Sequence, residues 1–189
     1  MTNPAFGCVD NTIRLRSGKY FNLADPKPDQ FEFSDIAGAL ANICRFGGHC
    51  DGFYSVAEHC CHCERVAEIE GHPQAARLAV LLHDATEAFV GDCVKPLKVM
   101  LPDYSAIEKR IEAVVAERFG VDFEKYKTLV SKLDHEMLIA ERRGLFTPDK
   151  VTWCGEDQVR ILNIHFYKWS PDRAETHFVV QAERLGIAV

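Results

Sequence analysis

The stretch 81–88, Leu-Leu-His-Asp-Ala-Thr-Glu-Ala, places three ionisable side chains inside an apolar segment with helical spacing. On a helix, His83 lies four residues and Asp84 three residues before Glu87, so the three side chains share one edge. An ionisable group in apolar surroundings is costly unless it is paired or binds a metal. The chain must therefore bring partners to this edge from other elements, or leave it in solvent as a salt-bridged helix.

Apolar residues recur at helical spacing along most of the 189 residues, and glycine or proline ends each run. We expect Ser34 or Asp35 to cap the first helix, which ends near Arg45, and Ser170 to cap the last. A short β-hairpin is expected to turn at Ser17-Gly18. Further helices are predicted over 54–70, 74–89, 104–119, 123–145 and 171–185, with a hairpin of 12–16 and 19–23, a basic turn over 94–98 and an irregular segment over 149–169.

These elements predict an all-α fold, a compact helical bundle with a small N-terminal β-hairpin. At this length the chain is expected to form a single domain over 1–189. Its core is expected in about 30–147, with the irregular segment and last helix in 148–189.

The net charge of −6 argues against a nucleic-acid polymer or an anionic membrane as partner. Residues 1–6 lack the basic and apolar regions of a secretory signal, and no run reaches the length of a membrane span. The eight cysteines are therefore expected as reduced thiols in a cytoplasmic protein. A small phosphorylated substrate stays compatible with this charge, because a local basic pocket can bind it.

Two further residues are candidates to join His83 and Asp84 in a metal site. His59 lies in the middle of the predicted 54–70 helix, and Asp134 lies inside the 123–145 helix, where His135 and Glu136 compete with it. Two imidazoles and two carboxylates would form a mixed nitrogen and oxygen site. Such a site suits one divalent transition metal, Mn, Co, Fe, Ni or Zn, better than Ca²⁺, with Mg²⁺ as an alternative.

The order His59, His83-Asp84, Asp134 resembles the HD-domain metal-dependent phosphohydrolases. The resemblance covers about residues 10–145, and it is nearest to bacterial 5′-deoxynucleotidases and phage deoxyadenosine triphosphohydrolases. The segments similar in order and spacing are Asp35-Ile36-Ala37, Arg45-Phe46, 54–59, 81–88, Gly91-Asp92 and Pro96-Leu97-Lys98.

The resemblance implies an HD-domain bundle and a role for each matched residue. Glu87 would be the acid or base that handles the attacking water, and Asp92 would position that water or protonate the leaving group. Phe46 would lie against the base or sugar. The implied metal ligands are His59, His83, Asp84 and Asp134, and the implied substrate contacts are Arg45, Phe46, Lys98, Lys95 and His49.

The expected activity is hydrolysis of nucleoside 5′-phosphates, most simply of deoxynucleoside monophosphates. A triphosphohydrolase that prefers the adenine deoxynucleotide is the alternative, with Lys95, Lys98, Lys132, Arg142 and Arg143 as candidates for the outer phosphates. Two-metal relatives add histidines before the last aspartate. Residues 85–133 contain none, so one metal is expected and cyclic-nucleotide cleavage is disfavoured.

Two readings of other classes stay open. A nucleotide-binding HD module would keep the fold without turnover, although the intact ligand set and Glu87 speak against it. A structural zinc module could use the run His59-Cys60-Cys61-His62-Cys63, but a helix spreads these residues around its circumference. Cys60 and Cys63 are expected in the core instead. The segment with Trp153, Phe166 and Trp169 leaves open a homodimer surface.

Overall fold

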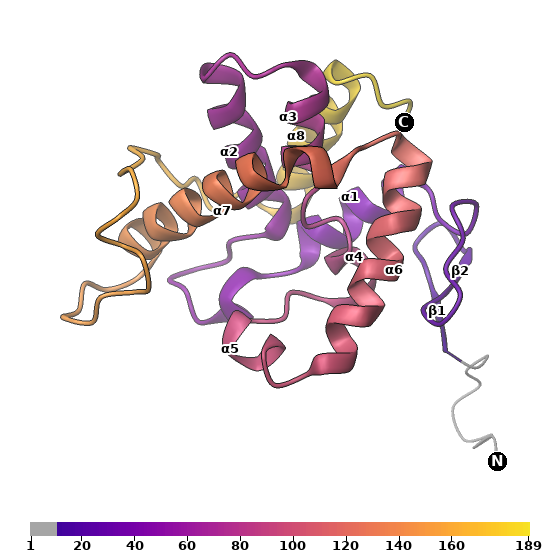
Figure 1. The fold of residues 1–189 in the computed structure, drawn as a ribbon, viewed down its shortest axis with the longest axis horizontal. Coiled ribbons are helices and arrows are strands. Elements are labelled where there is room, and N and C mark those ends of the chain that lie inside the picture. Colours follow the sequence, from indigo (N-terminus) through magenta and orange to yellow (C-terminus); the bar gives the residue numbers. More distant parts are fainter. Residues whose placement is uncertain (1–10) are drawn as a thin grey trace.

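The structure is a computed structural model of the chain, and it describes residues 11–189. Helices dominate it, and the strands of this part form a two-stranded antiparallel hairpin (Figure 1). The predicted all-α class with a small N-terminal hairpin is therefore confirmed. In chain order the elements are β1 (Thr12–Arg14), β2 (Tyr20–Asn22), α1 (Phe33–Asn42), the 3₁₀ helix η2 (Arg45–Gly48), α2 (Val56–Ile69), α3 (Gln74–Leu81), α4 (Glu87–Val90), α5 (Lys95–Lys98), α6 (Pro102–Phe119), α7 (Phe123–Leu145) and α8 (Pro171–Arg184).

An aromatic side chain of the hairpin, Phe21, packs into the core against residues that follow it in the chain. In its register Ile13 of β1 lies opposite Phe21 of β2. The turn contains Gly18, whose φ of 88° lies in the left-handed region that glycine adopts without strain. The fully buried Phe21 ring stacks on Phe89, with 4.0 Å between ring centroids, and Phe31 meets it edge-on.

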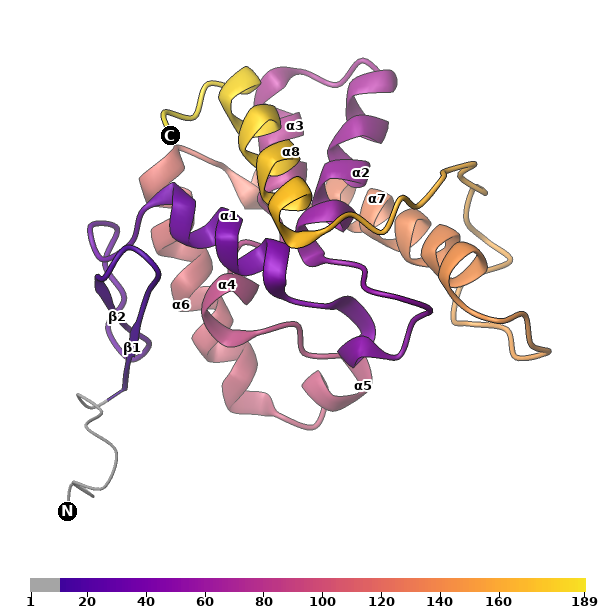
Figure 2. The same cartoon turned by 180° about the vertical axis from the view of Figure 1, so that it is seen from behind.

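The main hydrophobic core lies where α1, α2, α3 and α8 pack against one another. From behind, α8 lies over α1 and in front of α3 (Figure 2). Phe33 of α1 stacks on Phe178 of α8, with 5.7 Å between centroids. On the other side α7 packs on α2 and α3, where Leu133 and Met137 fill a second cluster. The core reaches beyond 30–147, since the hairpin and the last helix both contribute to it.

Capping side chains and a glycine set several helix ends, and the cap at Ser170 is the predicted one. The Ser55 side chain accepts a hydrogen bond from the Glu58 amide and caps α2, and Ser170 caps α8 in the same way through Arg173. Gly120 ends α6 in the left-handed conformation, with a φ of 66°. The bounds of α7 agree with the predicted 123–145.

The first helix differs from the prediction at both ends. Its N-cap is Glu32 rather than Ser34 or Asp35, and the Asp35 carboxylate accepts from the Glu32 amide at 2.9 Å. The helix ends before residue 45 because Cys44 is extended and forms an isolated β-bridge with Ser55.

The predicted helix over 74–89 is interrupted. α3 ends at Leu81, α4 begins only at Glu87, and turns connect them. At this break the Val80 carbonyl accepts a hydrogen bond from the imidazole Nδ1 of His83 at 2.7 Å. The expectation that the ionisable residues of 81–88 share the edge of one regular helix is therefore wrong.

Smaller differences concern α5 and α7. Residues 95–98 form a short helix rather than a turn. Gly144, expected to end the 123–145 helix, lies inside it, where the Phe166 ring packs against the glycine.

The predicted irregular segment over 149–169 is confirmed, and it extends beyond the C-terminal end of α7 (Figure 1). Its aromatic rings largely pack within the chain. Trp169 is buried, and Phe166 meets Tyr54 edge-on at 5.5 Å between centroids. These contacts lie within the chain, and the homodimer surface stays a prediction.

Each helix within residues 11–189 is too short or too polar to span a lipid bilayer. The cysteines of this part are free thiols, as expected. Cys8 and the predicted absence of a secretory signal in residues 1–6 lie outside the described residues.

Candidate metal centre

Four predicted ligands from three parts of the chain meet at one point. His59 lies on α2, His83 and Asp84 lie in the turns between α3 and α4, and Asp134 lies on α7. α2 packs against α3 and α7, and these contacts bring the four together. We refer to these four residues as the His/Asp cluster.

The distances within the His/Asp cluster are those of atoms around one centre. The two imidazole Nε2 atoms of His59 and His83 lie 3.2 Å apart. Asp84 Oδ2 lies 3.6 Å from the His59 nitrogen and 3.3 Å from that of His83. Asp134 Oδ1 lies 3.3 Å and 3.9 Å from the same two nitrogens. Neighbouring ligands at about 2.1 Å from a metal lie roughly 3.0–3.4 Å apart. Three of the five separations fall in this range, and the other two, 3.6 Å and 3.9 Å, would need only small shifts around one ion.

The outer nitrogen of each imidazole is held in place. His59 Nδ1 lies 2.6 Å from Oε1 of the fully buried Glu141, and His83 Nδ1 lies 2.7 Å from the Val80 carbonyl oxygen. When these nitrogens donate, both Nε2 lone pairs point into the cluster. Metal-binding histidines in proteins are oriented by the same kind of outer partner.

Glu141 is itself tied by two further side chains. The Tyr54 hydroxyl donates to its Oε1 at 2.9 Å, and Arg45 donates to its Oε2 at 3.1 Å. The guanidinium of Arg45 also reaches Asp84 Oδ2 at 3.4 Å. Burial acts to raise the pKa of Glu141, but Arg45 and His59 lower it below its usual value, so the carboxylate stays charged. A charged partner fixes both the tautomer and the orientation of His59.

Sequence reasoning missed Glu141 and Tyr54. Glu141 lies seven residues after Asp134 on α7, two turns along the same face. Glu141 could have been predicted from one pattern in the sequence. It is a carboxylate on an otherwise apolar helix face, and it shares that face with the predicted ligand Asp134. Tyr54 carries no such pattern, because its hydroxyl meets Glu141 only in the tertiary structure.

The His/Asp cluster is closed on the histidine side and open on the aspartate side. The side chain of His59 is fully buried and that of His83 is 7% exposed, whereas Asp84 is 20% and Asp134 46% exposed. Water or a substrate would therefore approach past the two carboxylates.

Without a metal, hydrogen bonds between protonated imidazoles and charged carboxylates hold the His/Asp cluster together. Burial acts to lower the pKa of His83, but Asp84 and Asp134 contribute to raising it well above its usual value. Burial acts to raise the pKa of Asp134, yet hydrogen bonds from His59 and His83 hold it well below its usual range. A divalent cation would replace these protons, since imidazole binds metal in its neutral form.

Asp134, rather than its neighbours, reaches the histidines. His135 points toward the irregular segment, where a Cβ added at Gly155 would lie 2.7 Å from its Nε2. Glu136 accepts a hydrogen bond from Arg160 at 2.6 Å and pairs with Lys132 at 3.9 Å. Of the three residues competing in the sequence, only Asp134 contacts His59 and His83.

The two predicted catalytic carboxyls lie in a low-dielectric environment. Burial and then the charges of Asp84 and Asp92 raise the pKa of Glu87 to about 9. Oε2 of Glu87 is buried and has no hydrogen-bond partner among residues 11–189. Burial also raises the pKa of Asp92, whose Oδ2 accepts the backbone N–H of Phe46 at 3.1 Å.

Arg45 and Phe46 sit between the His/Asp cluster and the irregular segment. The Phe46 backbone has a φ of 58°, which is unusual for a non-glycine residue, and the bond to Asp92 supports it. Its ring lies 5.3 Å from the Arg45 guanidinium and meets Phe146 edge-on at 5.1 Å. Trp153 lies 6.2 Å away. Arg45 itself is buried, and its side chain donates hydrogen bonds to the carboxylates of Glu141 and Asp84.

Among the described residues, no hydrogen bond or ion pair links the remaining predicted substrate contacts to the His/Asp cluster. Lys98 pairs with Glu108 at 2.6 Å and lies over the Tyr104 ring. Lys95 and His49 are exposed, on α5 and just after η2. Their roles stay predictions.

The run of cysteines and histidines on α2 does not form one module. His62 turns away from His59, since its Nε2 lies 3.4 Å from Glu58 and its ring stacks on Trp169. Cys60 and Cys63 are fully buried, as predicted.

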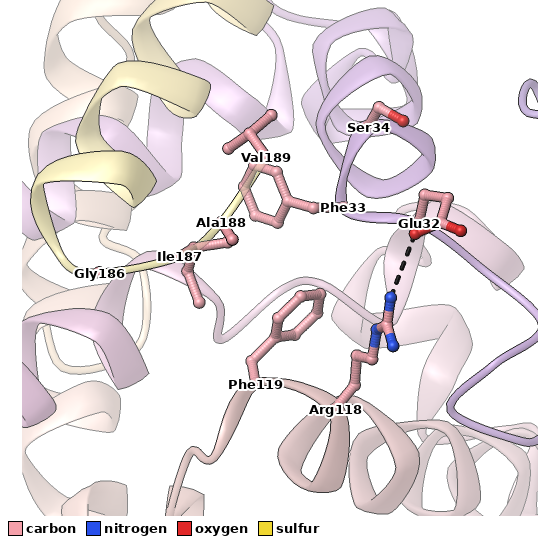
Figure 3. A pocket seen from close by; sticks show the side chains of 9 residues that line it. All are labelled: Glu32, Phe33, Ser34, Arg118, Phe119, Gly186, Ile187, Ala188 and Val189. Atoms are coloured by element: carbon pink, nitrogen blue, oxygen red, sulfur yellow. Dashed lines mark hydrogen bonds and ion pairs between the residues drawn. The ribbon is translucent and has the colours of Figure 1, made fainter.

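A cavity of about 450 Å³ lies elsewhere, between the start of α1, the end of α6 and the C-terminal residues (Figure 3). The ion pair of Glu32 and Arg118, 3.1 Å long, spans one side of it, and the Phe33 and Phe119 rings face it. No residue of the His/Asp cluster lines this cavity.

The fold and these residues define a helical protein with a candidate His/Asp metal centre. The chain is 41% identical over 141 residues, 75% of its own length and 76% of the relative's, to the Escherichia coli (strain K12) protein named "Uncharacterized protein YfdR". It is 39% identical over 113 residues, 57% of its length and 58% of the relative's, to "Uncharacterized protein RCAP_rcc00048" of Rhodobacter capsulatus. The chain therefore belongs to the family of YfdR. No protein-family profile matches it.

Proposed function

We propose that the protein is an HD-domain phosphohydrolase that uses one divalent metal to hydrolyse nucleoside 5′-phosphates, with deoxynucleoside monophosphates as its substrates. One observation carries the proposal. Nε2 of His59 and of His83 lie within 3.9 Å of Asp134 Oδ1 and within 3.6 Å of Asp84 Oδ2, while both Nδ1 atoms are tied outside. The order of these ligands in the sequence resembles that of HD-domain enzymes, and this likeness supports the proposal.

The donor set fits a divalent transition metal. Two neutral imidazoles and two carboxylates would balance the charge of the ion, and the exposed carboxylate side leaves room for water and a phosphate oxygen. A bound divalent ion would neutralise charge on the phosphate and lower the pKa of a bound water. The absence of histidine between residues 85 and 133 supports a mononuclear site.

Glu87 would transfer protons during the reaction, and Asp92 would act on the attacking water. In the metal-free chain Glu87 has a pKa of about 9 and carries its proton at neutral pH. A bound cation would lower that pKa toward neutrality, which suits the predicted acid or base that handles the attacking water. Asp92, held by the Phe46 amide, would orient the attacking water.

Arg45 would act in two ways. Its terminal nitrogens position Asp84 and Glu141, and hence the metal ligands. Its buried Nε has no partner among the described residues, which leaves a donor for a phosphate oxygen at the predicted position.

The pairing of basic residues favours a monophosphate over a triphosphate. Lys98 pairs with Glu108, Lys132 with Glu136, and Arg142 and Arg143 both with Glu156. Four of the five candidates for the outer phosphates already pair with carboxylates of the chain, and the fifth, Lys95, is exposed on α5.

The test is product analysis with the full chain. The purified protein is incubated with Mn²⁺ or Co²⁺ and a panel of deoxynucleoside mono- and triphosphates, and products are separated by anion exchange. We expect nucleoside and orthophosphate from monophosphates, lost in Asp84→Ala and kept in His135→Ala, which changes a neighbour of Asp134 outside the cluster. Nucleoside with intact triphosphate would instead identify a triphosphohydrolase. No product from protein shown to hold metal would leave a nucleotide-binding module.

A further inference from the structure

Two thiols of α2 lie beside the His/Asp cluster, and the proposed function does not use them. Cys60 and Cys63 are fully buried. Cys63 Sγ lies 3.7 Å from His59 Nε2. This is the nitrogen that faces His83 and the carboxylates, since the other nitrogen of His59 is tied to Glu141. The sulfur therefore lies on the metal side of the imidazole ring.

Helical geometry explains why this thiol reaches the cluster. Cys63 follows His59 by four residues, so both side chains project from the same face of α2. The ligand atoms of His59, Cys63 and His83 all lie within 4.8 Å of one another. Cys60 forms a second such group with His83 and Asp84, whereas the equally buried Cys61 belongs to neither group among the described residues.

The separations suit a tetrahedral site with one sulfur. With zinc about 2.3 Å from sulfur and about 2.1 Å from nitrogen, a tetrahedral sulfur–nitrogen edge is about 3.6 Å and a nitrogen–nitrogen edge about 3.4 Å. The corresponding distances here are 3.7 Å from Cys63 to His59 and 3.2 Å from His59 to His83. Asp84 Oδ2 lies 3.3 Å from the same His83 nitrogen and 3.6 Å from that of His59, so a small shift would bring it into a set of four with Cys63.

We propose that Cys63 is a further metal ligand, which makes the centre a site for soft cations such as Zn²⁺ and Cd²⁺. In this set His59, Cys63, His83 and Asp84 surround the ion, and the thiol proton leaves to solvent when the sulfur binds. The inference rests on the proposed function, because it shares the two histidines and Asp84 with the nitrogen and oxygen set that includes Asp134.

The choice of ligand set would regulate the enzyme through the identity of the metal. Thiolate selects soft cations, whereas carboxylates and water suit Mn²⁺. Four protein ligands in a tetrahedron leave no open position, as in structural zinc sites. Zinc or cadmium bound through Cys63 would therefore occupy the centre without admitting water, and would inhibit turnover supported by Mn²⁺.

Cadmium absorption tests the sulfur ligand directly. Metal-free full chain is titrated with Cd²⁺, and the ultraviolet charge-transfer band of a thiolate–cadmium bond is recorded. We expect the band in the unaltered protein and in the matched control Cys61→Ser. In Cys63→Ser we expect the band to vanish and the Cd²⁺ affinity to fall about tenfold or more, with Mn²⁺ affinity changed little. A band that survives in Cys63→Ser, or that is lost instead in Cys60→Ser, would overturn the assignment.

A second measurement needs no variant and covers the case in which Cys63→Ser does not fold. X-ray absorption of the zinc-loaded unaltered protein reports the atoms around the metal. We expect one sulfur at about 2.3 Å, and a shell of nitrogen and oxygen alone would overturn the inference. His83→Ala separates the two proposals, since Cd²⁺ and Mn²⁺ binding that both survive this change would contradict the His/Asp cluster itself.

Discussion

His59 Nδ1 lies 2.6 Å from Oε1 of Glu141, and both side chains are fully buried. The contact joins α2 to α7, the two helices that supply the first and last ligands of the His/Asp cluster. Because Glu141 also accepts from Tyr54 and Arg45, its carboxylate holds the imidazole from the side away from the metal. This geometry makes Glu141 a positioning residue for the metal centre.

Glu141→Gln should weaken metal binding by roughly 10- to 100-fold, the usual effect of removing a partner that orients a ligand. The amide keeps the shape and can still accept from Tyr54, but it no longer supplies the charge that fixes the His59 tautomer. Competition with a chromophoric chelator measures the affinity for Mn²⁺ or Co²⁺. Glu136→Gln is the matched control, because it removes another buried carboxylate of α7 that pairs with Arg160 instead. Equal affinities in both variants would contradict the positioning role.

Metal should stabilise the protein through Asp134. A ligand that binds only the folded state at 100 times its dissociation constant adds about 2.7 kcal/mol to the free energy of unfolding. We expect Mn²⁺ or Co²⁺ to raise the melting temperature of the unaltered chain and of His135→Ala, and to raise that of Asp134→Ala far less. Differential scanning fluorimetry with and without metal measures both. A full metal-induced shift in Asp134→Ala would exclude this residue as a ligand.

Local sequence was sufficient to predict the helices whose ends are set by their own residues. α7 and α8 are examples, since a periodic apolar stripe and, for α8, a cap at Ser170 determine their extent. The break between α3 and α4 was not predictable in this way. Leu-Leu-His-Asp-Ala-Thr-Glu-Ala favours a helix, and the turn that replaces it depends on the bond from His83 to the Val80 carbonyl and on contacts with His59.

The predicted ligands show the same division. The order of His59, His83, Asp84 and Asp134 was visible in the sequence, and the structure brings these four together. The residues that orient these ligands were not visible. Glu141 holds His59 only because the tertiary structure brings α2 and α7 together. Lys98 was also visible in the sequence, but its ion pair with Glu108 on α6 was not, and its contact with phosphate stays a prediction.

Glu58 should hold the irregular segment onto α2. Its buried carboxylate accepts the backbone N–H groups of Tyr167 and Lys168 at 3.0 and 3.1 Å, and that of Trp169 at 2.7 Å. Three such donors around one anion form a nest, and Lys168 adopts the φ of 52° that this curvature requires. Glu58→Ala would leave these amides without their charged acceptor and should cost about 3 kcal/mol or more.

Urea unfolding measures that loss, and limited proteolysis should show faster cleavage within 149–169. Glu68→Ala is the control on the same helix. It removes only a partly exposed carboxylate that pairs with Arg65 and Arg77, so we expect a change below about 1 kcal/mol. If the two variants lose the same free energy of unfolding, the backbone hydrogen bonds to Glu58 stabilise the protein no more than a surface ion pair does.

Two helical glycines should respond to alanine in opposite directions. Alanine is favoured over glycine by about 1 kcal/mol within a helix. At Gly144, an added Cβ would lie 2.5 Å and 2.7 Å from the Phe166 ring, which cannot withdraw freely because it packs against Tyr54 and His62. Gly144→Ala should therefore destabilise the protein by roughly 1–3 kcal/mol.

At Gly38 the added Cβ would meet the guanidinium end of Arg16, a flexible side chain that is 62% exposed. Arg16 can swing into solvent and would lose only its surface ion pair with Glu175, worth about 1 kcal/mol or less. Gly38→Ala should therefore be neutral or slightly stabilising. Urea unfolding of both variants measures the difference in the free energy of unfolding. Equal effects at the two positions would mean that the contact between α7 and Phe166 yields as easily as a surface arginine.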